Sequence, residues 1–195
     1  NAFRSGVGEC VRLGADIIVN TDADNQYSAD NIADLVQPII SGKAELVVGK
    51  RNLKESDNYT NLKKILHKLG TNVIKKASGL NISDPVSGFR AFTKDTALKI
   101  NIISDFSYTI EMLIQAGHKN IKIAEIDVKT NKTTRPSRLF KSIPQFLKGS
   151  IVTILRTYMQ YQPLKIFLTI GFIFILVGLL PIGRFLYFYL FEVGE

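Results

Sequence analysis

Apolar and polar positions in the first two thirds of the chain alternate between the spacing of helices and that of strands. Residues 2–13 have apolar side chains at helical spacing, and residues 17–19 form a short, partly β-branched apolar run. Helical spacing returns in residues 28–41, before a second apolar run at residues 45–48. Helices and strands that alternate in this way are typical of an α/β domain. The pattern therefore predicts a Rossmann-like, mostly parallel sheet, with the run at 17–19 as a buried parallel strand.

The same alternation continues to about residue 128. It predicts a long helix after residue 60 that ends at Gly79, two short helices at residues 96–100 and 108–116, and a strand at residues 121–128. The chain opens with a helix that leads directly into a strand, which is typical of the middle of an α/β domain. We therefore expect the chain to be a fragment that lacks the first strands of its domain.

The character of the sequence changes at residue 139. In residues 139–162 an apolar face is interspersed with Lys and Arg, which is typical of an amphipathic helix in the membrane interface. A helix of a protein core is the alternative interpretation. Residues 164–182 are almost wholly apolar, and a helix of ~20 such residues crosses a bilayer. Residues 185–191 are too short to cross, so we expect an interfacial loop or the start of a second span.

These changes divide the chain into three parts. Residues 1–138 are expected to form a partial α/β domain, residues 139–162 an interfacial helix, and residues 163–195 a transmembrane segment with the start of a following segment. Most nearby Lys and Arg residues precede the apolar segment, and an excess of such cations marks the cytoplasmic side. The protein is therefore expected in the cell membrane, with its α/β domain in the cytoplasm.

The net charge of +8 favours anionic partners such as nucleotide phosphates, lipid phosphates or a membrane surface. Nucleic acid is not an expected partner, because the sequence has no zinc-ligand spacing, no aromatic-studded sheet motif and no basic recognition helix. The single Cys10 excludes an intrachain disulfide framework and is typical of a reducing compartment.

Two carboxylates follow the first apolar run. Asp22, Asp24 and Gln26 offer hard oxygen ligands on one side of a divalent cation and leave positions for phosphate and water, as Mg²⁺ and Mn²⁺ prefer. In open α/β sheets, ligands bind beyond the carboxyl ends of the strands, where this motif lies. Turn or helix-cap acids and a phosphotransfer aspartate are alternatives. An EF-hand is not, because Tyr27 and Ala33 stand where that loop needs Gly and Glu.

Charged residues also mark two later turns. Arg51 follows the second apolar run at the same sheet edge, although a solvated loop arginine is the alternative. Asp84 and Arg90 bracket Gly88, whose backbone freedom permits a turn that would hold the two charges close together. A guanidinium at this turn suits a phosphate, and a structural ion pair across the turn is the alternative. His67 is expected on the solvated face of the long helix.

A basic loop occupies residues 129–138, around Pro136. Its cations suit a phosphate group or anionic lipid, and the loop is too irregular to be a helix face.

These motifs together resemble family 2 glycosyltransferases of the GT-A fold, specifically the dolichyl- or polyprenyl-phosphate sugar transferases that include dolichol-phosphate mannosyltransferases. The resemblance covers residues 1–139. It rests on residues 22–26, 49–51, 84–92 and 108–111, and the Ser-Gly-Phe-Arg-Ala sequence in the third of these segments makes the match specific to this branch.

The resemblance implies the following roles. Asp22, Asp24 and Gln26 would hold Mg²⁺ or Mn²⁺ on the pyrophosphate of a nucleotide sugar, so that Asp24 counts with Asp84 among the catalytic residues. Asp84 and Arg90 match the acceptor-side turn, where Asp84 would act as a positioning carboxylate or a base. The residues that would bind the acceptor phosphate are Arg51, Arg90, Lys64, Lys132, Arg135 and Arg138.

The implied reaction is the metal-dependent, inverting transfer of a sugar from a nucleotide diphosphate sugar to a dolichyl or undecaprenyl monophosphate at the cytoplasmic membrane face. We expect this of the parent protein, an EC 2.4.1-like hexosyltransferase, and expect the chain alone to lack activity. A family 2 enzyme with another acceptor and a non-catalytic, membrane-anchored fragment remain alternatives. A processive polysaccharide synthase is disfavoured, because its Gln-x-x-Arg-Trp motif needs a Trp and the chain has none.

Overall fold

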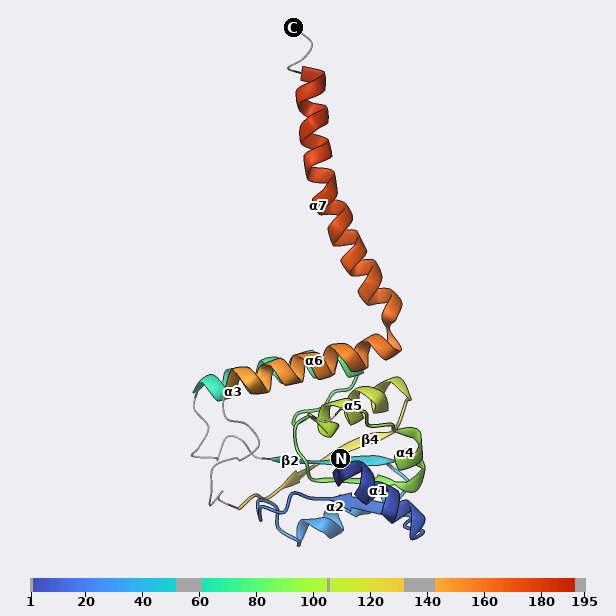
Figure 1. Ribbon diagram of the computed structural model, residues 1–195. Helices are drawn as coiled ribbons and strands as arrows, with labels where there is room; N and C mark the ends of the chain where they lie inside the picture. The colour runs from blue at the N-terminus through green and yellow to red at the C-terminus, as the bar shows by residue number, and fades with distance from the viewer. Residues whose placement is uncertain (1, 52–60, 105, 132–142, 192–195) are drawn as a thin grey trace. The chain divides into compact units, whose positions relative to one another are not determined.

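The computed structural model describes residues 2–51, 61–104, 106–131 and 143–191 (Figure 1). The chain divides into two compact units, Asn1–Thr157 and Tyr158–Glu195. The first unit has the mixed α/β architecture that the alternating pattern predicts, and the second is helical.

Four short strands form one mixed sheet in the first unit. They are β1 (Ile17–Asn20), β2 (Leu46–Arg51), β3 (Arg90–Thr93) and β4 (Ile123–Val128), and their order in the sheet is β1-β3-β2-β4. Strand β3 is antiparallel to both β1 and β2, whereas β2 and β4 are parallel. Strands β1, β2 and β4 therefore point the same way, as a mostly parallel sheet requires. The prediction that the first strand pairs in parallel was wrong, because β3 lies between β1 and β2.

Side chains of the central strands belong to two apolar clusters, one on each face of the sheet. Leu46 and Val48 of β2 point to one face, where they pack with residues of α1 (Ala2–Arg12) and α5 (Tyr108–His118). Val47 of β2 and Ala91 of β3 point to the other face and pack against α2 (Asn31–Ile40). Successive side chains of a strand alternate between its faces. The chain therefore buries a near-continuous apolar run from both sides, which explains why β2 reads as apolar throughout.

The long helix predicted after residue 60 is α3 (Asn61–Ser78), which packs against α5. Gly79 follows it with φ +73°, a left-handed conformation that favours glycine at the end of a helix. The short helix α4 (Lys94–Lys99) follows β3, and Thr93 caps it by accepting a hydrogen bond from the Thr96 N–H. Helix α2 begins at Asn31, two residues later than a cap at Ser28 predicts, because the Ser28 hydroxyl accepts from the Asp30 N–H in a turn before the helix.

Helix α6 (Ile143–Tyr161) confirms a helix within the segment predicted to be amphipathic. Its buried row consists of the hydroxyl residues Ser150, Thr153 and Thr157. The Thr153 hydroxyl lies 3.2 Å from the Ser104 hydroxyl, in the loop before α5. Since hydroxyl groups occupy the inner row, much of the apolar side of α6 is left exposed.

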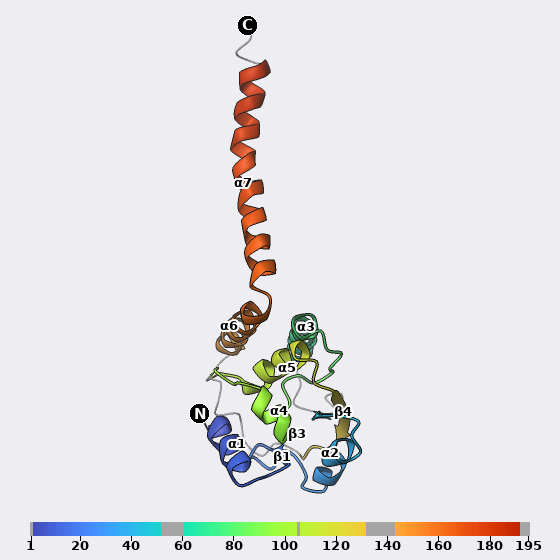
Figure 2. The same ribbon diagram turned by 90° about the vertical axis from the view of Figure 1, so that its right-hand side faces the viewer.

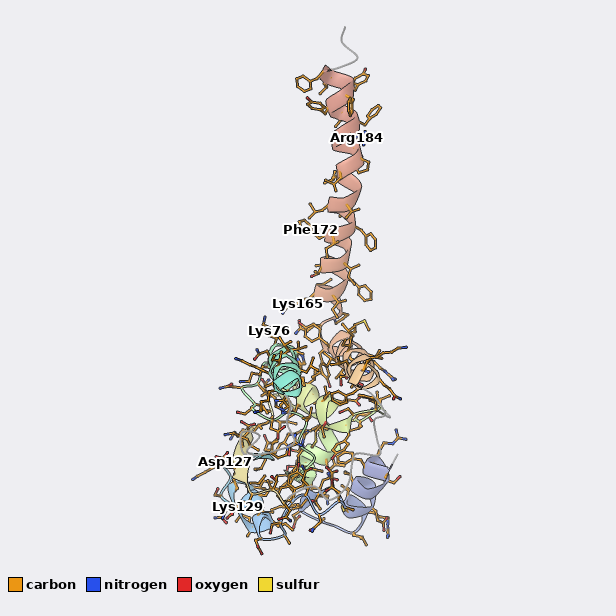
Figure 3. All side chains as sticks on the ribbon, turned by 90° about the vertical axis from the view of Figure 1, so that its left-hand side faces the viewer. Lys76, Asp127, Lys129, Lys165, Phe172 and Arg184 are labelled. Carbon is orange, nitrogen blue, oxygen red and sulfur yellow. The ribbon has the colours of Figure 1, made fainter. Side chains whose placement is uncertain are left out.

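Helix α7 (Pro163–Phe191) makes up most of the second unit and contains no buried residue. Figure 3 shows side chains projecting from all around it, with Lys165, Phe172 and Arg184 labelled along its length. Among the described residues, α7 is the one helix that is long and apolar enough to cross a membrane, judged by length and composition alone. The prediction of a separate segment at residues 185–191 was wrong, because α7 continues as one helix through Pro181 to Phe191.

Candidate active site

Asn20, the last residue of β1, ties the acidic motif to the turn that precedes β3. Its side-chain amide donates to the Gly88 carbonyl at 2.8 Å and to the Tyr108 hydroxyl at 2.7 Å. Burial raises the pKa of the Tyr108 phenol to about 12, so this hydroxyl stays neutral at physiological pH. The end of β1, the turn before β3 and the first turn of α5 are therefore fixed to one another by two short hydrogen bonds.

The Asp22 carboxylate lies directly against the backbone of Gly88. A Cβ atom placed on Gly88 would be 2.6 Å from Asp22 Oδ2, which is too close for a non-bonded contact. No described residue donates a hydrogen bond to this carboxylate. Partial burial and then the charge of Asp24 raise the pKa of Asp22, and the charges of Arg51 and Arg90 lower it in part. Asp22 is therefore a carboxylate whose negative charge the protein does not fully compensate.

Asp24 and Gln26 lie in a turn that the segment after β4 holds in place. Asp24 Oδ1 accepts from the Gln26 N–H at 3.0 Å, and Asn25 between them has a left-handed φ of 59°. Asn131 donates from its side chain to the Asn25 carbonyl and from its N–H to the Gln26 carbonyl, at 3.0 and 2.9 Å. The motif thus has a defined backbone, and both residues are exposed as a whole, although the Asp22 carboxylate is partly covered where it lies against Gly88.

The oxygen atoms of this motif fit a hard divalent cation. Among the described residues no three His, Cys, Asp or Glu side chains gather into a closed metal cluster. Asp22, Asp24 and Gln26 instead offer oxygen donors within five residues of chain, a type of ligand that suits Mg²⁺ or Mn²⁺ because those ions keep positions for phosphate and water. The raised pKa of Asp22 fits the same interpretation, since a cation would offset the cost of holding a partly buried charge beside Asp24.

Asp84 is buried and held by two residues from different elements. Arg51, the last residue of β2, donates from Nε to Asp84 Oδ2 at 2.6 Å and from Nη2 to Oδ1 at 2.8 Å. His67 Nε2 of α3 lies 3.4 Å from Asp84 Oδ1. Burial raises the pKa of Asp84, but the hydrogen bonds from Arg51 and His67 together outweigh burial and hold this pKa well below its ordinary value. Asp84 is therefore an ionised anchor for Arg51.

The guanidinium that pairs with Asp84 is not the one that the turn motif suggests. Arg90 is fully buried, and its three hydrogen bonds go to backbone carbonyls: Nε to Ser87, Nη1 to Thr109 and Nη2 to Pro85, at 2.8 to 2.9 Å. Burial lowers its pKa to about 10, which leaves it charged at neutral pH. The prediction of Arg90 as an acceptor-phosphate ligand is corrected accordingly, because the side chain is fully buried and its three hydrogen bonds hold the turn.

The remaining predicted cations are not gathered at this site by any described contact. Lys64 is exposed on the first turns of α3, and no hydrogen bond or ion pair joins it to the described site residues. Lys132, Arg135 and Arg138 lie outside the described residues.

The sequence interpretation missed His67, which was expected on a solvated face. The available signal was its position on α3. His67 falls at helical spacing with Thr71, Ile74 and Ser78, all of which are buried. A histidine on the buried side of a helix is expected to contact a polar group inside the domain.

The sequence of this region matches a known protein family. Residues 12–100 match the family model described as glycosyl transferase family 2. Over 135 residues the chain is 38% identical to a UDP-N-acetylglucosamine--dolichyl-phosphate N-acetylglucosaminyltransferase of Methanococcus voltae, covering 65% of this chain and 52% of that protein. It is 23% identical over 133 residues to an undecaprenyl-phosphate mannosyltransferase of Micrococcus luteus, covering 65% of this chain and 54% of that protein.

The fold matches solved glycosyltransferases. A crystal structure of glucosyl-3-phosphoglycerate synthase from Mycobacterium tuberculosis, in complex with Mn²⁺, UDP-glucose and glycerol 3-phosphate, superposes with a TM-score of 0.58 at 17% identity. The alignment covers 80% of this chain and 53% of that one. The chain thus spans about half the length of the curated relatives and of the solved structure that it matches. Residues 12–100 of this chain therefore match the glycosyl transferase family 2 model, and the chain has the fold of solved glycosyltransferases of the GT-A type.

Proposed function

We propose that this chain is part of an enzyme that transfers a sugar from a nucleotide diphosphate sugar to a polyprenyl or dolichyl monophosphate. The observation that carries the proposal is the open pair of carboxylates, Asp22 and Asp24, beside a buried Arg51–Asp84 pair. Two relatives are named for transfer to a dolichyl or undecaprenyl phosphate, which supports the choice of acceptor.

The donor half of the proposed site is the acidic motif. Asp22, Asp24 and the Gln26 amide would hold Mg²⁺ or Mn²⁺ against the diphosphate of the nucleotide sugar. When bound, such an ion supplies charge neutralisation to the diphosphate leaving group. A solved structure of the same fold contains Mn²⁺ and UDP-glucose, which supports a divalent cation and a nucleotide sugar as ligands.

The acceptor half of the proposed site is Arg51. A phosphate monoester is already ionised near neutral pH, so its oxygen needs no strong general base to act as a nucleophile. In the proposed step this oxygen forms a bond to the anomeric carbon, and the bond from that carbon to the diphosphate breaks with the electron pair leaving on the nucleoside diphosphate. The anomeric configuration inverts in such a direct displacement. Arg51, held in place by Asp84, would donate hydrogen bonds to the acceptor phosphate in this step.

Asp84 serves this scheme as a positioning residue. A carboxyl group with a strongly lowered pKa is a weak proton acceptor, and both its oxygens already accept hydrogen bonds. Its charge instead fixes the plane and position of the Arg51 guanidinium. We therefore assign Asp84 to orientation of Arg51.

The membrane part of the proposal concerns α7. This helix would anchor the protein in the bilayer that contains the lipid acceptor, and the α/β unit would lie on the cytoplasmic side, where nucleotide sugars are available. Helix α7 is long and apolar enough for the anchoring role.

The test is a transfer assay with the full-length protein in membranes. Polyprenyl phosphate is supplied with a panel of labelled nucleotide sugars that begins with UDP-N-acetylglucosamine, the donor in the name of the Methanococcus relative. Label is expected in the lipid phase with Mg²⁺ or Mn²⁺, and its loss is expected with a chelator. Asp24→Asn should abolish transfer, whereas Asp34→Asn, the same chemical change at an exposed position on α2, should preserve it.

Two results would contradict the proposal. Chelator-resistant transfer would remove the role of the acidic motif. Transfer to a water-soluble acceptor but not to polyprenyl phosphate, with the same donor and cation, would favour a family 2 enzyme with another acceptor.

A further inference from the structure

Helix α3 has an exposed apolar row that its packing in the domain does not use. Ile65, Leu69 and Val73 recur every four residues and are 57%, 58% and 50% exposed. The opposite side of the helix, which includes Ile74 and Ser78, is buried toward α5. The row is therefore a continuous apolar edge on the outside of the domain.

The charged side chains of α3 itself are all basic. Helix α3 contains five lysines and no acidic residue: Lys63, Lys64, Lys68, Lys75 and Lys76. Lys64, Lys68 and Lys76 are exposed, and Lys76 is labelled on α3 in Figure 3. An apolar row flanked by lysines is typical of a helix that lies on an anionic membrane surface.

Helix α6 presents a second row of the same kind. Its residues Ile151, Val152 and Leu155 are each 50% to 55% exposed, opposite the buried hydroxyl row, and Lys148 and Arg156 are exposed beside them. Figures 1 and 2 both place α3 and α6 on the α5 side of the sheet, and in Figure 2 α5 lies below both helices, toward the sheet. The two rows therefore border the same side of the domain.

We propose that α3 joins α6 in a single docking surface for an anionic lipid bilayer. Here "docking surface" means the apolar rows of Ile65, Leu69 and Val73 on α3 and of Ile151, Val152 and Leu155 on α6. This inference rests on the proposed function, in which the acceptor is a lipid. The occupant is a bilayer because cations flank both rows and because a single residue, Gln162, separates α6 from the apolar helix α7.

Contact of α3 with lipid would also affect the position of residues in the proposed active site. The same helix presents His67, on its inner row, to Asp84. A membrane surface that holds α3 therefore also sets the position of the Asp84 anchor and, through it, of Arg51. The docking surface would thus place the acceptor-binding half of the site at the level of the lipid phosphates.

The inference is tested by fluorescence quenching from lipids. In full-length protein whose native cysteines, Cys10 among them, are replaced by Ser, single Cys residues are introduced by Leu69→Cys on α3, Leu155→Cys on α6 and Lys43→Cys as a control. Lys43 is exposed and follows α2, which covers the other face of the sheet. Each Cys is labelled with an environment-sensitive dye, and the protein is reconstituted in vesicles of phosphatidylcholine and phosphatidylglycerol that contain a doxyl-labelled quenching lipid.

Quenching is expected to be several-fold stronger at positions 69 and 155 than at position 43. The combined change Lys68→Glu and Lys76→Glu should reduce quenching at position 69, and removing phosphatidylglycerol should do the same. Equal quenching at positions 69 and 43 would overturn the inference. A blue-shifted but unquenched dye at position 69 would also overturn it, because a protein surface would then cover α3.

Sugar transfer measured on the same vesicles separates this inference from the proposed function. Transfer to polyprenyl phosphate without quenching at position 69 overturns the docking surface and leaves the proposed function intact. Quenching at position 69 without transfer from any donor supports the docking surface and counts against the proposed function.

Discussion

The Asp22 carboxylate occupies the space in which a side chain on residue 88 would begin. A Cβ atom on Gly88 would lie 2.6 Å from Asp22 Oδ2 and 3.0 Å from Oδ1. Asn20 holds the Gly88 carbonyl at 2.8 Å, so the backbone cannot easily move away. The glycine between Asp84 and Arg90 is therefore required less by the turn than by the carboxylate beside it.

Gly88→Ala should consequently damage the proposed cation site without unfolding the domain. The added methyl group displaces Asp22, so we expect at least a ~10-fold loss of metal-dependent transfer, the loss that corresponds to about 1.4 kcal/mol of transition-state stabilisation. The measurement is transfer rate against Mn²⁺ concentration. Gly70→Ala on α3 is the matched control, because a Cβ there meets nothing within 4 Å. Its activity should be unchanged, and an equal loss in both variants would contradict the explanation.

Asp22→Asn should separate metal binding from stability. The pKa of Asp22 is raised in the folded protein, mainly by burial, so its ionised form at neutral pH opposes folding. Without metal, Asp22→Asn is therefore expected to melt at the same temperature as the wild type or higher. With Mn²⁺, the wild type should gain stability and the variant should not. Thermal unfolding with and without Mn²⁺ measures both effects, and Asp34→Asn should behave as the wild type does. A variant that melts lower without metal would contradict the conclusion that the charge of Asp22, partly buried beside Asp24, opposes folding.

Arg51→Ala should cost far more stability than the loss of a surface ion pair. It would leave Asp84, whose side chain is 1% exposed, as a buried charge without its two shortest hydrogen bonds. Breaking such a pair from one side costs about 3 kcal/mol or more. The adjacent Lys50 pairs with Asp127 at 3.0 Å on the surface, so Lys50→Ala should cost less than ~1 kcal/mol. Urea unfolding of both variants makes the comparison, and similar losses would show that the Arg51–Asp84 pair is not an anchor.

The sequence pattern predicted the elements better than their order. Helix α1 was predicted at residues 2–13 and is found at Ala2–Arg12, because the side that packs on the sheet must repeat at helical spacing. The insertion of β3 between β1 and β2 was not predictable in this way. It depends on pairing between residues far apart in sequence, such as Asn20 with Arg90, and periodicity contains no information about such partners.

The candidate site was predictable where chemistry depends on local spacing. Asp22, Asp24 and Gln26 lie in one turn, so their proximity follows from the sequence. The roles of Arg90 and His67 depend instead on what the fold brings near them. A fully buried guanidinium that finds three carbonyls and an exposed one that faces a phosphate look the same in sequence, and only packing distinguishes them.

The pH dependence of stability provides a test of the Asp84 anchor. Its pKa is lowered in the folded protein, so the stability that ionised Asp84 contributes is fully present above the unfolded-state value of about 3.9. That contribution is lost as pH falls below this value toward the lower folded-state pKa. Asp84→Asn cannot make the contribution at any pH. The difference in unfolding free energy between wild type and variant should therefore be constant from about pH 5 to 7 and shrink below about pH 4. Urea unfolding across this range measures the difference. A difference that grew on acidification would mean that the folded state raises the Asp84 pKa, and the Arg51 and His67 contacts would then not hold the carboxylate ionised.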